Sequence, residues 1–383
     1  MKCPRCLNED PSYFFKGSKG WMCRMCISFK RILVEEELLP RKSAEIHEGS
    51  EAFSLPFALT EQQEARALKC AALVFSRDVF IDAVTGAGKG DLVVYAIAAM
   101  LEKKKKVGFA IARRQVVLEI YERLKRIFPK AKVIAVCEGY HDEIDGDIIV
   151  CTTHQCYRYY QTFDLLILDE VDAFPFKGNE VLQNIVLTSC KGHMVYLTAT
   201  KDSFVQQRVK ASNAAVLNLY VRPHGYPLIV PEVVKGPQVV LWLRLYRWIK
   251  GKKKRLVFVP TIKQAEMYAK LCFFVKGKAL TSKTKNKDEI IHEFRSGAID
   301  ILFATTVLER GVTFEGIDVC VMEADHGVFD EASLIQMAGR VGRSFKCPTG
   351  ECLFLIKGKS EEVTKCITKI KEANSYAKVS VVS

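Results

Sequence analysis

A chain of 383 residues with a formal net charge of +13 is long enough for two or three domains. Hydrophobic residues make up 49% of it, which is enough for large buried cores, and the basic charge favours nucleic acid or an anionic membrane surface as a partner. A basic protein with neither partner is the alternative. We find no apolar run long enough to span a membrane and expect no signal peptide, so the 14 cysteines are expected to be thiols and metal ligands of a cytoplasmic protein.

The chain begins with two C-x-x-C pairs, Cys3–Cys6 and Cys23–Cys26, at the spacing of a zinc ribbon. Each pair directs two thiolates at one ion, so the four sulfurs complete a tetrahedral site without an open position. We therefore predict a structural zinc site in which the stretch between the pairs forms a small hairpin. So short a module cannot fold on its own core, and the metal is expected to supply the folding energy. Four unrelated buried thiols are the alternative.

A phosphate-binding loop is predicted at Asp82–Asp91, because an apolar strand at 73–81 leads into it and a helical run at 92–101 follows it. Its glycines let backbone amides approach phosphate oxygens, and the helix N-terminus adds partial positive charge. Lys89 is expected to reach the β- and γ-phosphates of ATP, while a glycine turn without a ligand is the alternative. The nucleotide-contacting residues of this loop are predicted to be Gly86, Ala87, Gly88, Lys89, Gly90 and Asp91.

Gly90 stands where such loops usually carry a Ser or Thr whose hydroxyl holds Mg²⁺. Asp91 is acidic, but a shift of one residue on a helix turns its side chain about 100° away, so we do not expect it to replace the missing ligand. Water is expected to complete the Mg²⁺ shell. Nucleotide binding should therefore persist, whereas hydrolysis should be slow and need raised Mg²⁺.

Two features upstream of this loop bear on nucleotide binding. Thr60 is predicted to cap the helical run 65–72. Gln63 is predicted to read the adenine edge with its paired donor and acceptor. Gln62 is the alternative reader, and a plain polar helix start is the alternative for both.

An apolar run at 163–168 delivers two carboxylates, Asp169 and Glu170, at the end of a predicted strand. A phosphate loop requires such partners: Asp169 is expected to hold Mg²⁺ through water, and Glu170 to orient and deprotonate the attacking water. The next predicted strand carries Thr198 and Thr200. These hydroxyls are expected either to couple hydrolysis to movement or simply to cap the strand.

Strands and helices alternate from Leu59 onward, which predicts a parallel sheet covered on both faces. Arg113 follows the predicted strand 107–111 and is expected to contact a nucleic-acid backbone, with a solvated helix start as the alternative. A stretch rich in proline and glycine, 222–231, is interpreted as a domain boundary, and a second alternating block follows it.

The second block contains Gln336-x-x-Gly-Arg340-x-Gly-Arg343, whose arginines project from one helical face. Opposite a γ-phosphate they are arginine fingers, which stabilise the charge of the transition state, and Gln336 is predicted to contact the nucleotide. Because these residues lie in the second block, we expect the nucleotide to bind between two domains and to close them. Two solvated arginines are the alternative.

Taken together, the motifs resemble those of superfamily 2 helicases over residues 57–383: Gly86–Lys89, Asp169–Asp172, Thr198–Thr200 and Gln336–Arg343. The four-cysteine module, Asp169–Phe176 and Leu308–Phe314 narrow the resemblance to the late competence ComFA family. The fold this implies is α/β, with two tandem RecA-like parallel-sheet domains and a small N-terminal zinc-ribbon module. The expected divisions are the zinc module at 1–30, a linker at 31–56 and RecA-like domains at 57–220 and 221–383.

The same resemblance implies a cytoplasmic DNA-dependent ATPase, either free or at the inner face of the cell membrane. It would drive or assist the import of single-stranded DNA in natural transformation, with ATP, Mg²⁺ and Zn²⁺ as cofactors. The implied partners are single-stranded DNA and the competence proteins of the uptake machinery beside a membrane channel; self-association is left open. The ATPase residues carried over by motif are Lys89, Asp169, Glu170, Arg340 and Arg343. Those expected to face the nucleic-acid backbone are Thr152, Thr153, Thr305 and Thr306.

Two other functions stay open from the sequence. One is another zinc-bearing superfamily 2 DNA or RNA helicase, and the other is a nucleotide-binding DNA scaffold that hydrolyses weakly because of Gly90. No wedge or pin element is evident, so translocation is favoured over separation of a duplex.

Overall fold

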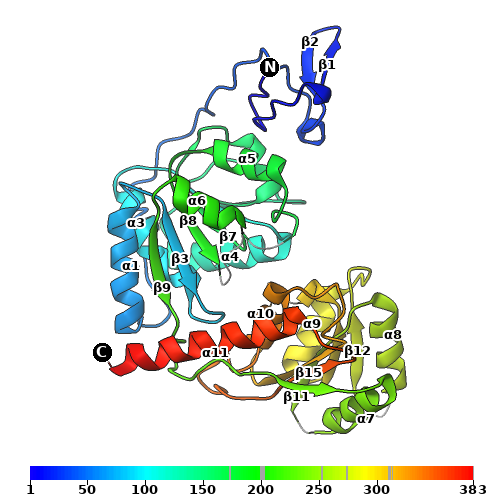
Figure 1. The fold of residues 1–383 in the computed structure, drawn as a ribbon. Helices are drawn as coiled ribbons and strands as arrows, with labels where there is room; N and C mark the ends of the chain where they lie inside the picture. Colours follow the sequence, from blue (N-terminus) through cyan, green and yellow to red (C-terminus); the bar gives the residue numbers. More distant parts are fainter. Residues whose placement is uncertain are drawn as a thin grey trace. The chain divides into compact units, whose positions relative to one another are not determined.

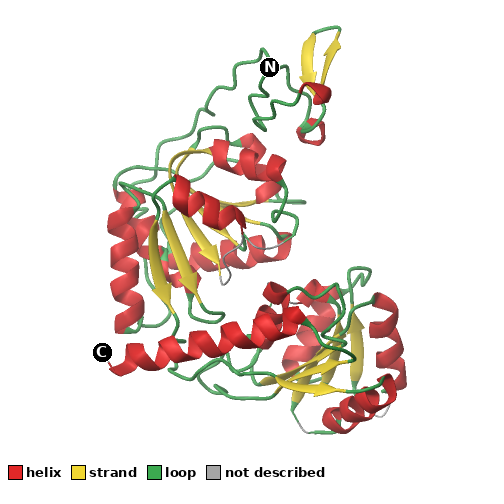
Figure 2. Cartoon of the chain, in the orientation of Figure 1, coloured by secondary structure: helices red, strands yellow, loops and turns green. Residues whose placement is uncertain are grey.

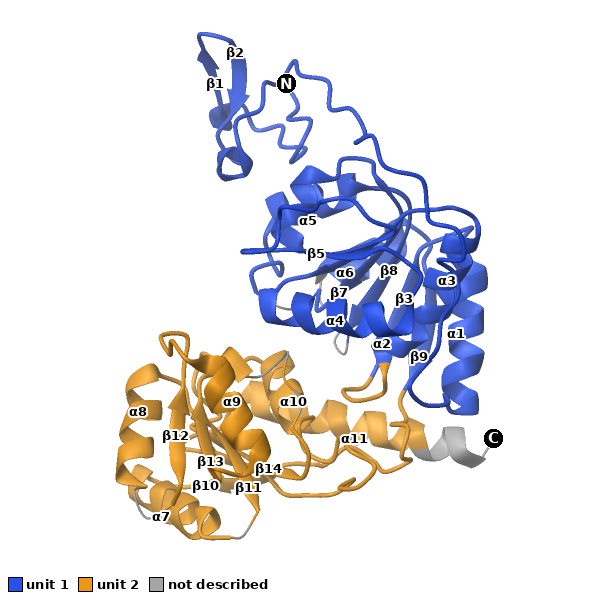
Figure 3. Ribbon diagram, turned by 180° about the vertical axis from the view of Figure 1, so that it is seen from behind, with its two compact units in different colours: residues 1–83, 89–219 blue, residues 84–88, 220–383 orange. Residues whose placement is uncertain are grey.

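A computed structural model describes residues 1–171, 174–198, 203–251, 253–272, 275–308, 312 and 314–382 (Figures 1 and 2). The chain forms two compact units (Figure 3). Unit 1 contains Met1–Ala83 and Lys89–Leu219, and unit 2 contains Val84–Gly88 and Tyr220–Ser383. The phosphate-loop segment Val84–Gly88 thus makes its main contacts with the C-terminal half of the chain. No helix within the described ranges is long and apolar enough to cross a bilayer.

The N-terminal module is the small hairpin that the cysteine spacing predicts. Strand β1 (Phe14–Gly17) pairs antiparallel with β2 (Gly20–Cys23), and the turn η2 (Ile27–Phe29) follows the second cysteine pair. Its interior consists of little more than the four cysteines, Phe14 and Ile32. Such a small core agrees with a module that depends on a metal ion for its stability.

The segment between the module and the first sheet is held against the rest of unit 1, to which it belongs. The Ala44 amide donates to Asp145 Oδ2 at 2.7 Å, the His47 ring lies 3.0 Å from Asp147, and the Ser54 amide donates to the Ile127 carbonyl at 2.9 Å. These contacts fix the segment at three points, so it is not a loose connection.

Unit 1 is built on a seven-stranded sheet in which every neighbouring pair is parallel. The strand order is β5 (Val133–Val136), β6 (Ile148–Thr152), β4 (Val107–Ile111), β7 (Phe163–Asp169), β8 (Cys190–Thr198), β3 (Val79–Ala83) and β9 (Ala215–Leu219). Its helices and 3₁₀ turns are α1 (Glu61–Leu73), α2 (Lys89–Leu92), α3 (Val94–Glu102), α4 (Arg114–Ile127), η3 (Thr153–Arg158), α5 (Glu180–Ser189) and α6 (Ser203–Ala211). One face of the sheet, which carries Phe80, Leu166 and Tyr196, is covered by η3, α5 and α6.

Unit 2 repeats this architecture with a six-stranded parallel sheet. The order is β10 (Glu232–Lys235), β15 (Cys352–Ile356), β14 (Ile317–Met322), β11 (Lys254–Phe258), β13 (Ile301–Ala304) and β12 (Gly277–Leu280). The helices and the turn are α7 (Gln238–Ile249), α8 (Ile262–Leu271), α9 (Lys287–Ser296), η4 (Thr306–Leu308), α10 (Glu331–Ala338) and α11 (Glu361–Val382). Leu241, Leu245 and Tyr268 of α7 and α8 pack on a core that includes Val257 and Phe303. Both predicted parallel α/β sheets are therefore present.

The boundary between the first helix and the first strand of unit 1 differs from the prediction. The strand expected over 73–81 is shorter, because Leu73 still belongs to α1 and β3 begins only at Val79. The apolar end of the helix and the apolar start of the strand are separated by a short turn that contains neither glycine nor proline, so hydrophobicity alone joined them into one run.

Candidate functional site

The loop after β3 has the backbone that a phosphate-binding loop needs. Gly86 and Gly88 have φ angles of 82° and 80°, in the left-handed region that glycine adopts without strain. The Ala87 amide closes a turn on the Val84 carbonyl at 3.1 Å. Helix α2 then begins at Lys89. A strand, a glycine turn and a helix N-terminus thus follow one another as predicted, while the contacts of this loop with ATP stay a prediction.

The two predicted carboxylates lie at the same edge of the first sheet as this loop. Asp169 is the last residue of β7, and β7 is separated from β3 only by β8, so the carboxyl ends of these parallel strands meet at one edge. Glu170 has a φ of 55°, and its amide donates to Asp169 Oδ1 at 2.8 Å. A non-glycine residue in this conformation is costly and is enriched at functional sites. The left-handed backbone turns the chain directly after Asp169, at the position predicted to hold the catalytic base.

Glu323 occupies the equivalent position in the second sheet, directly after β14, and has a φ of 52°. Its carboxylate is engaged there by Lys357 Nζ and by Gln264 Nε2, each at 2.8 Å. In unit 2, a carboxylate on the same backbone geometry therefore forms an ion pair within the protein.

Thr60 is the N-cap of α1, as predicted, and the helix begins at Glu61, earlier than the predicted run 65–72. Gln63 completes a capping box: its Oε1 accepts the Thr60 amide at 3.0 Å, and its own amide donates to Thr60 Oγ1 at 3.3 Å. The Gln62 carbonyl accepts from Arg66 Nη1 at 3.0 Å. The capping box gives the Gln63 side chain a structural role that needs no ligand. That Gln63 also contacts adenine stays a prediction.

Asp91 already has a cationic partner in the protein. The residue is 3% exposed, and its carboxylate forms an ion pair with Arg123 of α4. The same arginine crowds Gly90, where an added Cβ would lie 3.1 Å from Arg123 Nη1. The ion pair thus explains how an acidic residue is tolerated inside the start of α2, and it shows what a larger residue at position 90 would meet.

In unit 2, the end of α10 lies directly against the loop segment Val84–Gly88. A Cβ at Gly339 would lie 2.0 Å from Thr85 Oγ1, so only glycine fits there. Arg343 Nε donates to the Gly339 carbonyl at 2.9 Å, and a Cβ at Gly86 would lie 3.7 Å from Arg343 Cγ. Gln336 and Arg340 are buried, at 8% and 1% exposure. Within unit 2, the turn after α10 therefore lies beside Thr85 and Gly86 of the predicted phosphate loop, and the role of Arg340 and Arg343 in catalysis stays a prediction.

Arg222 is a further residue of this site that the sequence reading missed. It is 2% exposed, and it donates to the carbonyls of Thr85 at 3.0 Å, Val341 at 2.8 Å, Gly342 at 2.8 Å and Gly339 at 3.0 Å. Burial, with the nearby charge of Arg343, lowers the pKa of Arg222 to about 9. The guanidinium ties the phosphate loop to the turn after α10. Its setting, Arg-Pro-His-Gly, indicates only a domain boundary, because nothing in that pattern distinguishes a buried arginine from a solvated one.

The predicted nucleic-acid contacts lie at strand ends but differ in accessibility. Arg113 precedes α4, Thr152 ends β6, and Thr153 opens η3 with only 1% of its surface exposed. Thr305 and Thr306 follow β13 and are half-buried. The side chain of Thr153 is therefore not presented at the surface. Asp172, Thr200 and most of the predicted motif 308–314 lie outside the described residues.

The four cysteines of the module form one cluster that fits zinc. Their sulfurs all lie within 4.8 Å of one another, with Cys3 to Cys26 at 3.6 Å and Cys6 to Cys23 at 3.7 Å. A tetrahedral site with Zn–S bonds of about 2.3 Å places its sulfurs about 3.8 Å apart. Hydrogen bonding within the cluster lowers the pKa of Cys3, chiefly through Cys26, and raises that of Cys26. Four thiolates so close together would repel one another, so the four cysteines cannot all be deprotonated without a cation. Zinc bound there would neutralise this charge.

Two family models match the chain: the type III restriction enzyme res subunit over residues 57–203 and the helicase conserved C-terminal domain over residues 238–345. Competence protein ComFA of Streptococcus pneumoniae is 33% identical over 400 residues, which cover 98% of this chain and 90% of that protein. The chain belongs to the ComFA family. Competence protein ComFA of Bacillus subtilis is 30% identical over 98% of this chain and 86% of its own length.

Solved structures show the same fold at low identity. S. cerevisiae Dbp5 bound to RNA and ADP BeF3 matches with a TM-score of 0.62 and 19% identity, over 82% of this chain and 87% of that one. Helicase Lhr of Mycobacterium smegmatis, bound to ssDNA and AMP-PNP, matches with a TM-score of 0.62 and 14% identity, over 83% of this chain and 48% of that one. The two sheets are thus tandem RecA-like helicase domains, preceded here by the four-cysteine module. Membership of the ComFA family and the helicase domains imply ATPase activity.

For this ComFA-family chain, Gly90→Thr is expected to raise ATP turnover roughly threefold and to lower the Mg²⁺ concentration needed, because a hydroxyl would orient the ion. Arg123 must yield by a few tenths of an ångström to admit the new Cβ. The measurement is steady-state ATPase across a Mg²⁺ titration. Gly90→Ala is the matched control, since it adds the Cβ and helix propensity without the hydroxyl. Equal behaviour of the two variants would show that the hydroxyl is irrelevant.

Arg222→Lys is expected to lower ATP turnover about tenfold, because one ammonium cannot bridge the four carbonyls and the loop would lose its fixed position. The control is Arg244→Lys, which alters an exposed ion pair with Glu232 in the same unit. Both variants are compared by ATPase rate and by thermal unfolding. A normal rate in a folded Arg222→Lys protein would mean that this arginine is not needed to position the loop.

Proposed function

We propose that this protein is an ATP-driven translocase of single-stranded DNA that assists the import of transforming DNA in natural competence. Its similarity to two competence proteins ComFA over 98% of the chain supports the cellular role. The observation that carries the motor function is the placement of the glycine loop, Asp169 and the strained Glu170 at one edge of a RecA-like sheet.

The chemistry follows from the residues at that edge. Lys89 and the loop amides bind the phosphates, and Asp169 holds Mg²⁺, which neutralises phosphate charge when bound. Glu170 takes a proton from the attacking water. Arg340 and Arg343 stabilise the charge that spreads over the transferred phosphoryl group. Each RecA-like domain holds the strand. ATP binding closes the two domains and hydrolysis reopens them, and this alternation moves the strand.

The nucleic-acid partner is single-stranded DNA held through its backbone. The +13 charge supports an electrostatic grip, and polar residues at strand ends, such as Arg113, Thr152 and Thr305, supply contacts that do not read sequence. The protein works in the cytoplasm at the inner face of the membrane, with the proteins of the DNA-uptake machinery as partners.

The test is steady-state ATPase of the full chain with single-stranded DNA, duplex DNA, RNA or no nucleic acid. Stimulation that is strongest with single-stranded DNA is expected. Equal or stronger stimulation by RNA would favour another type of superfamily 2 helicase. Nucleotide binding without multiple turnovers would favour a DNA-binding scaffold. Gly90 would then explain the weak hydrolysis, because it lacks the hydroxyl that holds Mg²⁺.

A further inference from the structure

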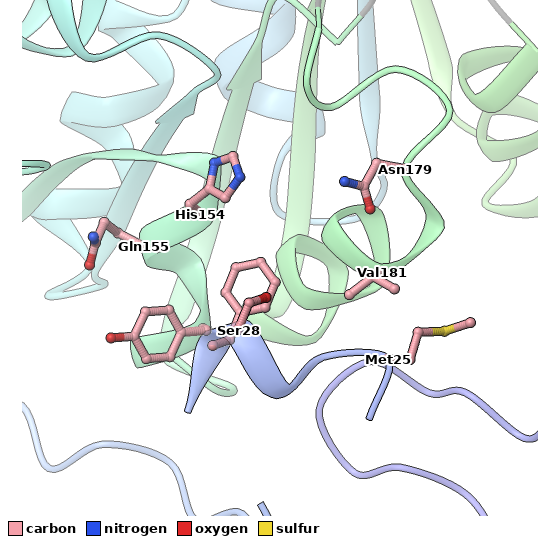
Figure 4. A pocket seen from close by; sticks show the side chains of 8 residues that line it. Met25, Ser28, His154, Gln155, Asn179 and Val181 are labelled. Atoms are coloured by element: carbon pink, nitrogen blue, oxygen red, sulfur yellow. The ribbon is translucent and has the colours of Figure 1, made fainter. Parts of the chain in front are cut away.

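A pocket lies where the zinc module meets the first sheet's helices. The Asn184 side chain of α5 donates to the Cys6 carbonyl at 2.8 Å, and Thr188 Oγ1 lies 3.5 Å from the Arg5 carbonyl, so the module is docked on α5. Beside this contact is a cavity of about 540 Å³, lined from the module by η2 and from the motor by η3 and the start of α5 (Figure 4). Its volume is in the range of sites for small organic ligands, about 300–1,000 Å³.

The lining combines aromatic faces with amide groups. The Phe29 ring stacks on His154, with centroids 5.9 Å apart and planes 21° apart, and lies 5.9 Å from the Tyr157 ring. Gln155 and Asn179 add amides, and none of the described residues that line the cavity is acidic. The Arg158 guanidinium lies 5.1 Å from the centre of the Tyr157 ring and adds positive charge next to it. Aromatic rings, hydrogen-bonding amides and a nearby cation are the chemistry that holds an unstacked base and its phosphate.

The position of the pocket also suits a nucleic-acid strand. His154 and Gln155 follow Thr152, the residue that ends β6 and is expected to contact the DNA backbone. A strand held at Thr152 would lie within one turn of η3 of two residues that line the pocket. Phe29 comes from the zinc module, so a base bound in this pocket would contact the docked module directly.

We propose that this pocket binds one unstacked base of single-stranded DNA in contact with the rings of Phe29 and Tyr157. The inference rests on the proposed function, because the strand must run past Thr152. It goes beyond that function by assigning a base-binding site to the junction of the zinc module and the motor. Every base has a π-face, so the site should tolerate any sequence.

The test measures dissociation constants of the full-length protein for labelled oligo(dT) and for a strand of the same length with abasic sites throughout. Phe29→Leu and Tyr157→Leu are each expected to weaken oligo(dT) binding about tenfold and to leave binding of the abasic strand unchanged. Phe29→Tyr retains a ring and should bind like the original protein. Phe75→Leu, a partly exposed phenylalanine elsewhere in unit 1, is the control for a general loss of a ring.

Zinc content and circular dichroism show whether the module of the Phe29→Leu variant remains folded. If it does not, Tyr157→Leu tests the pocket through a residue outside the module. The pocket proposal is overturned if the original protein binds oligo(dT) but neither leucine variant changes its affinity. It is also overturned if they weaken the abasic strand equally. No binding of either strand by the original protein would instead overturn the proposed function, and this inference with it.

Discussion

Replacing Glu170 by glutamine is expected to lower ATP turnover by about 10²-fold or more, because an amide cannot accept the proton of the attacking water. Nucleotide binding should persist, since Lys89 and the loop glycines are untouched. The left-handed backbone at Glu170 is retained by glutamine, which has the same length. The loss should therefore appear in kcat, while the affinity for a fluorescent ATP analogue stays close to that of the original protein.

Glu323→Gln is the matched control for this experiment. Glu323 follows a buried parallel strand with the same positive φ, but its carboxylate pairs with Lys357 and Gln264. Its replacement is expected to reduce thermal stability slightly and to leave turnover within about twofold, since it removes one charged partner of an internal ion pair. If Glu170→Gln hydrolyses ATP as fast as the control variant does, another group is the base.

Loss of the zinc ligands is expected to unfold the N-terminal module while the motor keeps its ATPase activity. A Cys3→Ser, Cys6→Ser double variant should fall from about one zinc per chain to none, because serine does not replace the thiolates of a tetrahedral S₄ site. The docking contact of Asn184 with the Cys6 carbonyl should be lost with the hairpin. Metal analysis, limited proteolysis of the N-terminal segment and DNA-free ATPase are the three measurements.

Cys347→Ser is the control for this double variant, because Cys347 is partly exposed and lies outside the cluster. It should keep both its zinc and a protease-resistant N-terminus. A double variant that retained stoichiometric zinc and a folded hairpin would exclude these cysteines as ligands.

The features that could be predicted from the sequence are those set by local chemistry. The C-x-x-C pairs, the glycine loop after a buried strand and the Thr60 cap depend on residues near one another in the chain, so spacing alone specifies them. The parallel sheets follow from the alternation of apolar strands with helices. The family resemblance, drawn from motifs, agrees with the identity to ComFA proteins along nearly the whole chain.

The features that were missed depend on residues far apart in sequence. The pairing of Asp91 with Arg123, the four carbonyl contacts of Arg222 and the stacking of Phe29 on His154 each join separate elements. The residue types show that these side chains can form such contacts, but the partner of each one depends on the tertiary structure. Arg222 is the clearest example, because an arginine near a proline-rich boundary is usually solvated.

The anchored segment that follows the zinc module also limits how far the module can travel. Between Leu33, which bridges to Met22, and Ala44, which is held by Asp145, the chain can span at most about 40 Å even when fully extended. A module released from α5 would still be confined to a small volume around its docking site. Its effective concentration there would be in the millimolar range typical of short tethers, so re-docking would be an intramolecular event independent of protein concentration. Weak direct contacts are then sufficient to keep the module in place for most of the time.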